Sequence, residues 1–164
     1  MTYRFSLLFL LLPFLLLGGC GGPRKPEGFP NLVHPITVKV LKDGQPLSNV
    51  KVVLLPREPE LNFRVAADTN ASGVATMQTS RNTYSQTGAP EGKYVVQLVE
   101  SIAVKDIRPY PENDAEVPAW IKEYNAKLAA IRTIPAILAS ETDSPLEVEI
   151  LKSPVTIEID VAKY

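Results

Sequence analysis

The stretch from Ile36 to Leu54 reads ITVKVLKDGQPLSNVKVVL, and it decides the fold. Apolar β-branched residues at 36, 38 and 40 alternate with polar residues at 37, 39 and 42, which is typical of a strand with one buried face. Asp43-Gly44 is a strong signal for a hairpin turn. A second strand is expected over 50–55 and ends at Pro56. The stretch therefore predicts a β-rich fold.

Strand signals continue along most of the chain. A weaker strand is expected over 63–67, and stronger ones over 74–79 and 94–99, separated by a turn at 68–73 and a loop near 80–92. Two more alternating runs occupy 146–151 and 155–161. Because no helices separate these strands, a parallel βαβ sheet is not expected. The pattern favours an antiparallel, seven-stranded β-sandwich over residues 36–164.

One segment has helical rather than strand periodicity. Over 117–131, apolar residues recur at the three- and four-residue spacing of one helical face. A single amphipathic helix near 114–132 is therefore expected as an insertion in the sandwich. We expect it to pack on the sheets through Trp120, Tyr124 and Leu128.

Several motifs resemble a known family. The opening stretch resembles the start of a carboxypeptidase regulatory-like domain, which is a transthyretin-like (Ig-like) β-sandwich. Residues 67–75 (ADTNASGVA) and 88–94 (GAPEGKY) resemble later hairpins of that family. Ile134-Pro135 and residues 142–148 (TDSPLEV) resemble a segment of small planctomycete-type lipoproteins that carry the domain, although Ala136-Ile137 departs from their pattern. The resemblance implies a non-enzymatic accessory or binding domain.

The N-terminus has the features of a lipoprotein signal peptide. Residues 5–17 are apolar or proline except Ser6, and the run is too short to span a bilayer. Leu17-Gly18-Gly19-Cys20 resembles a bacterial lipobox, which predicts signal residues 1–19, cleavage before Cys20 and lipid attachment to its thiol. Residues 20–35 are rich in Pro and Gly and are expected to form a tether. The protein is expected in the bacterial cell envelope, lipid-anchored and facing the periplasm or cell surface.

Composition limits the possible chemistry. The chain has 164 residues, a net charge of −1, one Cys and one His. The near-neutral charge gives no reason to expect nucleic acid as a partner, and no cofactor is expected. His34 has no catalytic partner in the sequence and is interpreted as a solvated linker residue.

Two weaker candidate sites remain open. Asp68, Asn70 and Ser72 match the start of a Ca²⁺-binding loop, but the twelfth position is Thr79 rather than Glu, so a plain hairpin turn is favoured over a metal site. Trp120, Tyr124 and Tyr84 are candidate binding residues. Trp120 and Tyr124, together with Tyr110, could stack on a sugar ring. The two on the helix are more simply explained as packing residues.

The function that follows is a membrane-anchored, non-enzymatic binding or structural module. Its expected partner is an envelope protein or a glycan, which loops 56–62 and 80–92 are expected to bind. The alternatives are a Ca²⁺-dependent surface adhesin, a carbohydrate-binding module and, last, a secreted hydrolase.

Overall fold

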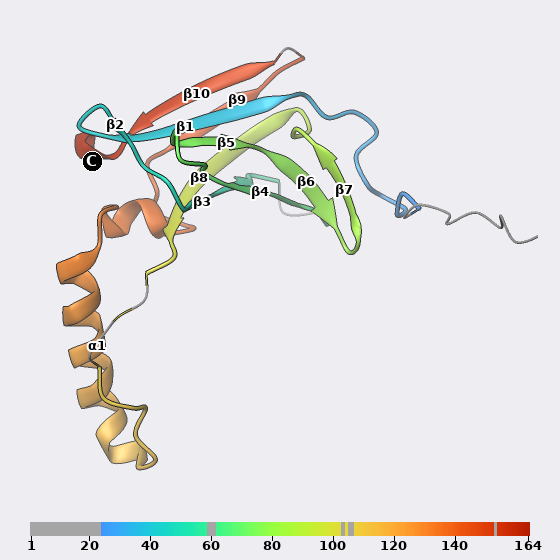
Figure 1. Cartoon of the computed structure of the whole chain (residues 1–164). Coiled ribbons are helices and arrows are strands. Elements are labelled where there is room, and N and C mark those ends of the chain that lie inside the picture. The colour runs from blue at the N-terminus through green and yellow to red at the C-terminus, as the bar shows by residue number, and fades with distance from the viewer. Residues whose placement is uncertain (1–23, 59–61, 103, 105–106, 153) are drawn as a thin grey trace, which may run out of the picture.

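The computed structural model describes residues 24–58, 62–102, 104, 107–152 and 154–164. It confirms a mainly β protein, with two sheets and one α-helix (Figure 1). The strands are β1 (Ile36–Lys42), β2 (Gln45–Pro46), β3 (Val50–Pro56), β4 (Arg64–Asp68), β5 (Val74–Thr76), β6 (Gln78–Arg81), β7 (Tyr84–Thr87), β8 (Gly92–Glu100), β9 (Glu147–Ile150) and β10 (Val155–Asp160). The helix is α1 (Val117–Ile131), and single 3-10 turns cover Asp114–Glu116, Ala136–Ala139 and Val161–Lys163.

The strands form two sheets that enclose one core. The smaller sheet has the order β10-β1-β2, with β5 also paired to β1, and the larger has the order β7-β6-β4-β3-β8-β9. Apolar residues of both sheets, such as Val38 and Leu54, join in a single buried cluster. The two sheets and their loops are called the β-body below.

The structure differs from the expected seven antiparallel strands in number and in one pairing. Ten strands are present among the described residues, and β1 pairs with β10 in parallel, from Ile36 opposite Val155 to Leu41 opposite Asp160. Strand alternation predicts which residues of β1 are buried, but it carries no information about the direction of a neighbour from the far end of the chain.

The Asp43-Gly44 turn forms, but it joins different strands from those expected. Both residues have positive φ (51° and 77°), and the turn pairs β1 only with the two-residue β2. The strand that follows, β3, belongs to the other sheet. The Asp160 carboxylate accepts hydrogen bonds from the backbone N–H groups of Asp43 and Gly44 and from Ala162, and these bonds lower the pKa of Asp160, the one from Ala162 most.

Two segments expected to be irregular are ordered parts of the β-body. Most of the 80–92 loop is the second half of the β6–β7 hairpin, with Asn82 at a positive φ of 53° in the turn. Within the predicted tether, Phe29 is buried and contacts the Tyr84 ring at a centroid distance of 4.8 Å. The N-terminal segment, residues 24–35, therefore packs on the β-body instead of extending as a free linker, because its Phe29 ring gains burial there.

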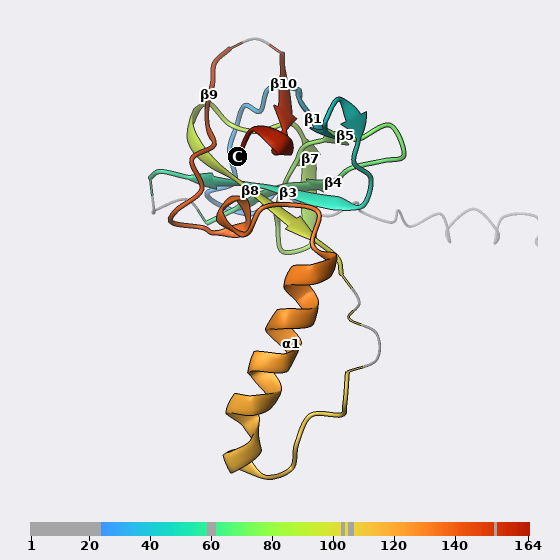
Figure 2. The same cartoon turned by 90° about the vertical axis from the view of Figure 1, so that its left-hand side faces the viewer.

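The helix has the predicted bounds but not the predicted packing. None of the residues of α1 is buried, and Figures 1 and 2 show it projecting away from the β-body. Residues 107–116 run out to its far end and α1 returns toward the sheets (Figure 2). We call residues 107–131 the arm. The expectation that Trp120, Tyr124 and Leu128 pack the helix along the sheets is wrong, because the arm supplies its own contacts.

Candidate functional site

The arm is held together by contacts between its outgoing segment and α1. The Trp120 indole N–H donates to the Arg108 carbonyl oxygen at 2.9 Å. The Arg108 guanidinium lies 3.2 Å from the Glu123 carboxylate and 3.5 Å from that of Glu116. Lys127 pairs with Glu123 one turn further along, at 3.0 Å. The hydrogen bond from Lys127 contributes most to lowering the pKa of Glu123, and the Lys127 charge and the hydrogen bond and charge of Arg108 lower it further.

An aromatic cluster takes the place of sheet contacts. The Trp120 and Tyr124 rings stack at a centroid distance of 5.2 Å and an interplanar angle of 14°. Tyr110 meets Trp120 edge-on, with centroids 5.1 Å apart and an angle of 69°. Such pairs stabilise an arrangement beyond the area that they bury. The Trp120 ring is thus covered by aromatic neighbours within the arm.

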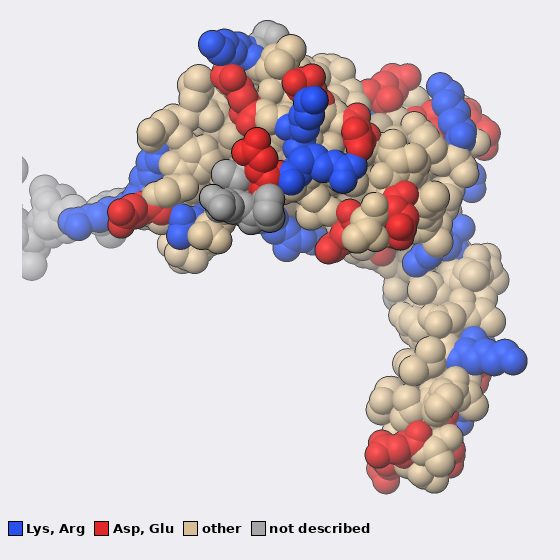
Figure 3. Space-filling view, turned by 180° about the vertical axis from the view of Figure 1, so that it is seen from behind, with Lys and Arg blue, Asp and Glu red and all other residues tan. Residues whose placement is uncertain are grey.

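The opposite face of α1 is open to solvent and poor in charge. Its exposed residues are mostly apolar or small, and Lys122 is the charged one among them; the others are Pro118, Ala119, Ile121, Asn125, Ala126, Ala129, Ala130 and Ile131. Ile121 and Ile131 are 45% and 48% exposed. Figure 3 shows this arm as a largely uncharged surface with acidic side chains at its tip. A solvated helix face usually carries more charge than this.

The tip of the arm combines negative charge with a capped 3-10 turn, Asp114–Glu116, which leads into α1. The Asn113 side chain accepts a hydrogen bond from the Ala115 N–H at 3.1 Å, and Pro118 lies in the first turn of α1. Exposed Glu112, Asp114 and Glu116 surround this cap. Carboxylates are favourable beside the N–H groups of a helix start, so the tip is stably acidic.

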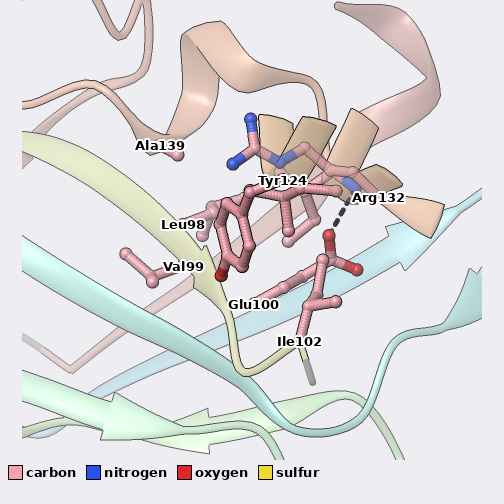
Figure 4. Close-up of a pocket in the computed structure, with 9 residues that line it drawn as sticks. Leu98, Val99, Glu100, Ile102, Tyr124, Arg132 and Ala139 are labelled. Carbon is pink, nitrogen blue, oxygen red and sulfur yellow. Dashed lines mark hydrogen bonds between the residues drawn. The ribbon is translucent and has the colours of Figure 1, made fainter. Parts of the chain in front are cut away.

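A small pocket marks the joint between the arm and the β-body. It has a volume of about 150 Å³ and is lined by Leu98, Val99, Glu100, Ile102, Tyr124, Leu128, Arg132, Ile134 and Ala139. Figure 4 shows the Tyr124 ring and the Glu100 carboxylate on its walls. The Glu100 carboxylate accepts hydrogen bonds from the backbone N–H groups of Thr133 at 2.9 Å and Ile134 at 3.0 Å, just after α1 ends.

Glu100 is a positioning residue that sequence reasoning missed. Its carboxylate fixes the chain where the arm rejoins the β-body, and charge-assisted bonds of this kind are stronger than neutral ones. In the sequence it is one charged residue at the end of a strand. No sequence signal pairs it with residues more than thirty positions later.

The three aromatic candidates do not form one site. Trp120 and Tyr124 are together in the arm, but Tyr84 lies on β7, at the far side of the β-body from α1 (Figure 1). There its ring packs against Phe29. Tyr84 thus secures the N-terminal segment rather than extending the arm.

The candidate Ca²⁺ loop adopts a hairpin turn. The Asn70 side-chain oxygen accepts the N–H groups of Ser72 at 2.9 Å and Val74 at 3.0 Å, while Asp68 lies 4.0 Å from the Lys51 ammonium. Two of the three expected ligands are therefore engaged with the protein itself. Over the part of the chain that is described, no three His, Cys, Asp or Glu side chains gather as a metal site would require.

His34 is buried, which corrects its interpretation as a solvated linker residue. It is 7% exposed, its Nε2 lies 3.1 Å from a Glu91 carboxylate oxygen, and its backbone exchanges two hydrogen bonds with Ala89. A single His between Leu-Val and Pro gives no hint of this pairing. It secures the N-terminal segment to the loop before β8.

Comparison of the chain with protein-family models, curated proteins and solved structures gives no match. In the described residues, no helix combines the length and hydropathy needed to cross a membrane. The expected lipidation site Cys20 and the preceding Leu17, Gly18 and Gly19 lie outside the residues that the structure describes.

Proposed function

We propose that this protein is a lipid-anchored, non-enzymatic binding module of the bacterial envelope, and that the arm is its contact surface. The finer fold within the mainly β class is a transthyretin-like sandwich of the carboxypeptidase regulatory-like type. The observation that carries the proposal is the open face of α1. Ordering a projecting helix with no buried residue costs conformational entropy, and contact with a partner would offset that cost.

The chemistry of the arm defines the partner. Its centre offers Ile121 and small side chains, and its tip offers Glu112 and Asp114. The matching surface is therefore a protein that is apolar in the middle and basic at one end. Charge complementarity of this kind sets orientation and association rate more than affinity.

The arm is tested by site-specific photo-crosslinking in intact envelopes. A photoreactive residue in place of Ile121 is expected to capture one partner, and the same residue in place of Lys42, at the end of β1 and outside the arm, is expected to capture none. Replacing Glu112 and Asp114 with Lys should remove the capture. Equal capture from both positions would contradict this assignment, and so would capture that survives the charge reversal. A crosslinked product with twice the mass of the chain would identify a second copy of this protein as the partner.

Anchoring is tested at Cys20. We predict that Cys20→Ser abolishes the incorporation of labelled palmitate and moves the protein from the membrane to the soluble fraction, because the thiol that would carry the lipid is gone. A Ser6→Ala variant is the matched control and should remain in the membrane. Membrane retention of the Cys20→Ser protein would show that another segment anchors it.

The absence of catalysis is tested with the full chain on ester, peptide and glycoside substrates. Nucleophilic catalysis needs a nucleophile within hydrogen-bond reach of a base, and the partners of His34 are Glu91 and the Ala89 backbone. No turnover is expected. Turnover that a His34→Gln substitution abolishes would overturn the proposal.

A further inference from the structure

The β-body carries a polar groove, and none of its described lining residues belongs to the arm. It has a volume of about 550 Å³ and is lined by Lys51, Arg64, Ala66, Ala67, Asp68, Asn70, Val74, Thr76, Gln78 and Ser80. These residues come from β3, β4, β5, β6 and the turn before β5. None of the described residues that line the groove is aromatic.

The groove forms because residues 74–80 change the strand with which they pair. The side chains of Val74, Thr76, Gln78 and Ser80 alternate with buried residues and so share the outer face. Before Met77 this stretch pairs with β1, and after Met77 it pairs with β4 (Figure 1). The pairing of β4 with β6 stops at Ala66, so the last residues of β4 and all of β5 diverge.

The groove carries an uncompensated positive charge. Lys51 and Asp68 lie within 4.0 Å of each other and largely cancel. The Arg64 guanidinium has no ion pair or hydrogen bond to any side chain in the described ranges of the chain. A guanidinium presents a planar fork of donors that matches a carboxylate.

The rest of the lining suits hydroxyl groups. Thr76 and Gln78 are exposed, and Ser80 is half-buried beside them. The floor is Ala66, which leaves room above the sheet. From Arg64 to Asp68 the groove extends about 13 Å along β4 at the rise of an extended strand, which is longer than one sugar ring.

We infer that this groove binds an acidic oligosaccharide, with the carboxylate of a uronic acid on Arg64 and sugar hydroxyls on Thr76, Gln78 and Ser80. A peptide that adds to the sheet would pair with the strand edges that β4 and β5 leave where they diverge. The saccharide is favoured because the polar side chains that line the groove lie on the outer face of the strands rather than at those edges. The inference concerns a different surface from the arm and does not depend on it.

The test measures binding of a galacturonic acid trimer to the full chain in detergent micelles by calorimetry. Saturable binding is expected, with a neutral galactose trimer showing none at the same concentration. Arg64→Gln should weaken binding at least about tenfold, because a charge-assisted bidentate contact is lost. Lys42→Gln removes an equal charge at a residue that does not line the groove, and it should leave the affinity unchanged.

A second variant changes the shape of the groove and leaves its charge unchanged. Ala66→Leu keeps every charged group but fills the floor, and it should abolish binding while the far-UV circular dichroism stays unchanged. NMR shifts on addition of the trimer should be confined to amides of β4, β5 and β6. No saturable binding, equal losses in Arg64→Gln and Lys42→Gln, or equal binding of a glutamate tripeptide would each overturn the inference. None of these results bears on the crosslinking expected at Ile121, so the two proposals are tested independently.

Discussion

At the scale of single residues, Tyr94 shows how burial changes chemistry in the core. It is the largest of the fully buried side chains, 1% exposed, and its hydroxyl donates to the Pro90 carbonyl at 3.0 Å. Burial, with a smaller contribution from the negative charge of Glu58, raises the pKa of Tyr94 from 10.0 to about 12. The folded protein therefore holds this proton more tightly than the unfolded chain does.

We predict that Tyr94 makes the protein less stable at alkaline pH. Between pH 10 and about 12 the unfolded state loses the Tyr94 proton first, so the free energy of unfolding falls as pH rises. The loss approaches about 2 kcal/mol at the upper end of this window. Urea titrations at pH 8 and at pH 11 should show this fall in the wild type and a smaller one in Tyr94→Phe. An equal fall in the free energy of unfolding in the two proteins would contradict the prediction.

Gly88 is a second residue whose identity is set by its surroundings. Its φ is 112°, and a Cβ at this position would lie 2.4 Å from the His34 carbonyl oxygen. We predict that Gly88→Ala lowers the free energy of unfolding by about 2–3 kcal/mol, because it adds backbone strain and an overlap with main-chain atoms.

Gly44 supplies the matched control for Gly88. Its φ is also positive, at 77°, but no heavy atom lies within 4 Å of the position that an alanine methyl group would take. Gly44→Ala should cost about 1 kcal/mol, from backbone strain alone. Urea denaturation of both variants checks the difference, and equal costs would show that the contact with His34 is absent.

At the scale of elements, the arm behaves as a unit separate from the sheets. We predict that Trp120→Ala lowers the free energy of unfolding of the β-body by less than about 1 kcal/mol, because the ring contacts and the hydrogen bond that Trp120 makes to described residues lie within the arm. Amide exchange in α1 should rise sharply in the same variant. Leu98→Ala, in the core, should cost about 2–5 kcal/mol. A loss of similar size in Trp120→Ala would show that α1 packs on the sheets.

The sequence predicted the elements better than their pairing. The bounds of β1 and α1 agree with the periodic patterns, because alternation and helical spacing are local properties. The single run expected over 74–79 is two strands, β5 and β6, in different sheets. Nothing in its alternation marks Met77 as the point of exchange, since the buried face is the same on both sides. The polar groove arises there and was not predictable.

At the scale of the whole molecule, the N-terminal segment belongs to the β-body. We predict that Phe29→Ala lowers the free energy of unfolding by about 2–4 kcal/mol, because a buried ring is removed. Leu32→Ala, at a side chain that is 61% exposed, should change it by less than about 0.5 kcal/mol. Urea denaturation measures both. Equal small effects would show that the segment is a free tether.

The sequence by itself determined that the chain is mainly β and that one amphipathic helix interrupts the strands. It also placed six of the ten described strands to within two residues, namely β1, β3, β4, β8, β9 and β10. Only the tertiary structure decided that β1 lies parallel to β10, that His34 is buried and that α1 stands away from the sheets. The physical reason is that the hydrophobic effect has no direction. An apolar stripe shows that side chains will be buried, but it does not show which surface buries them. Trp120 packs against Tyr110 and Tyr124 instead of a sheet.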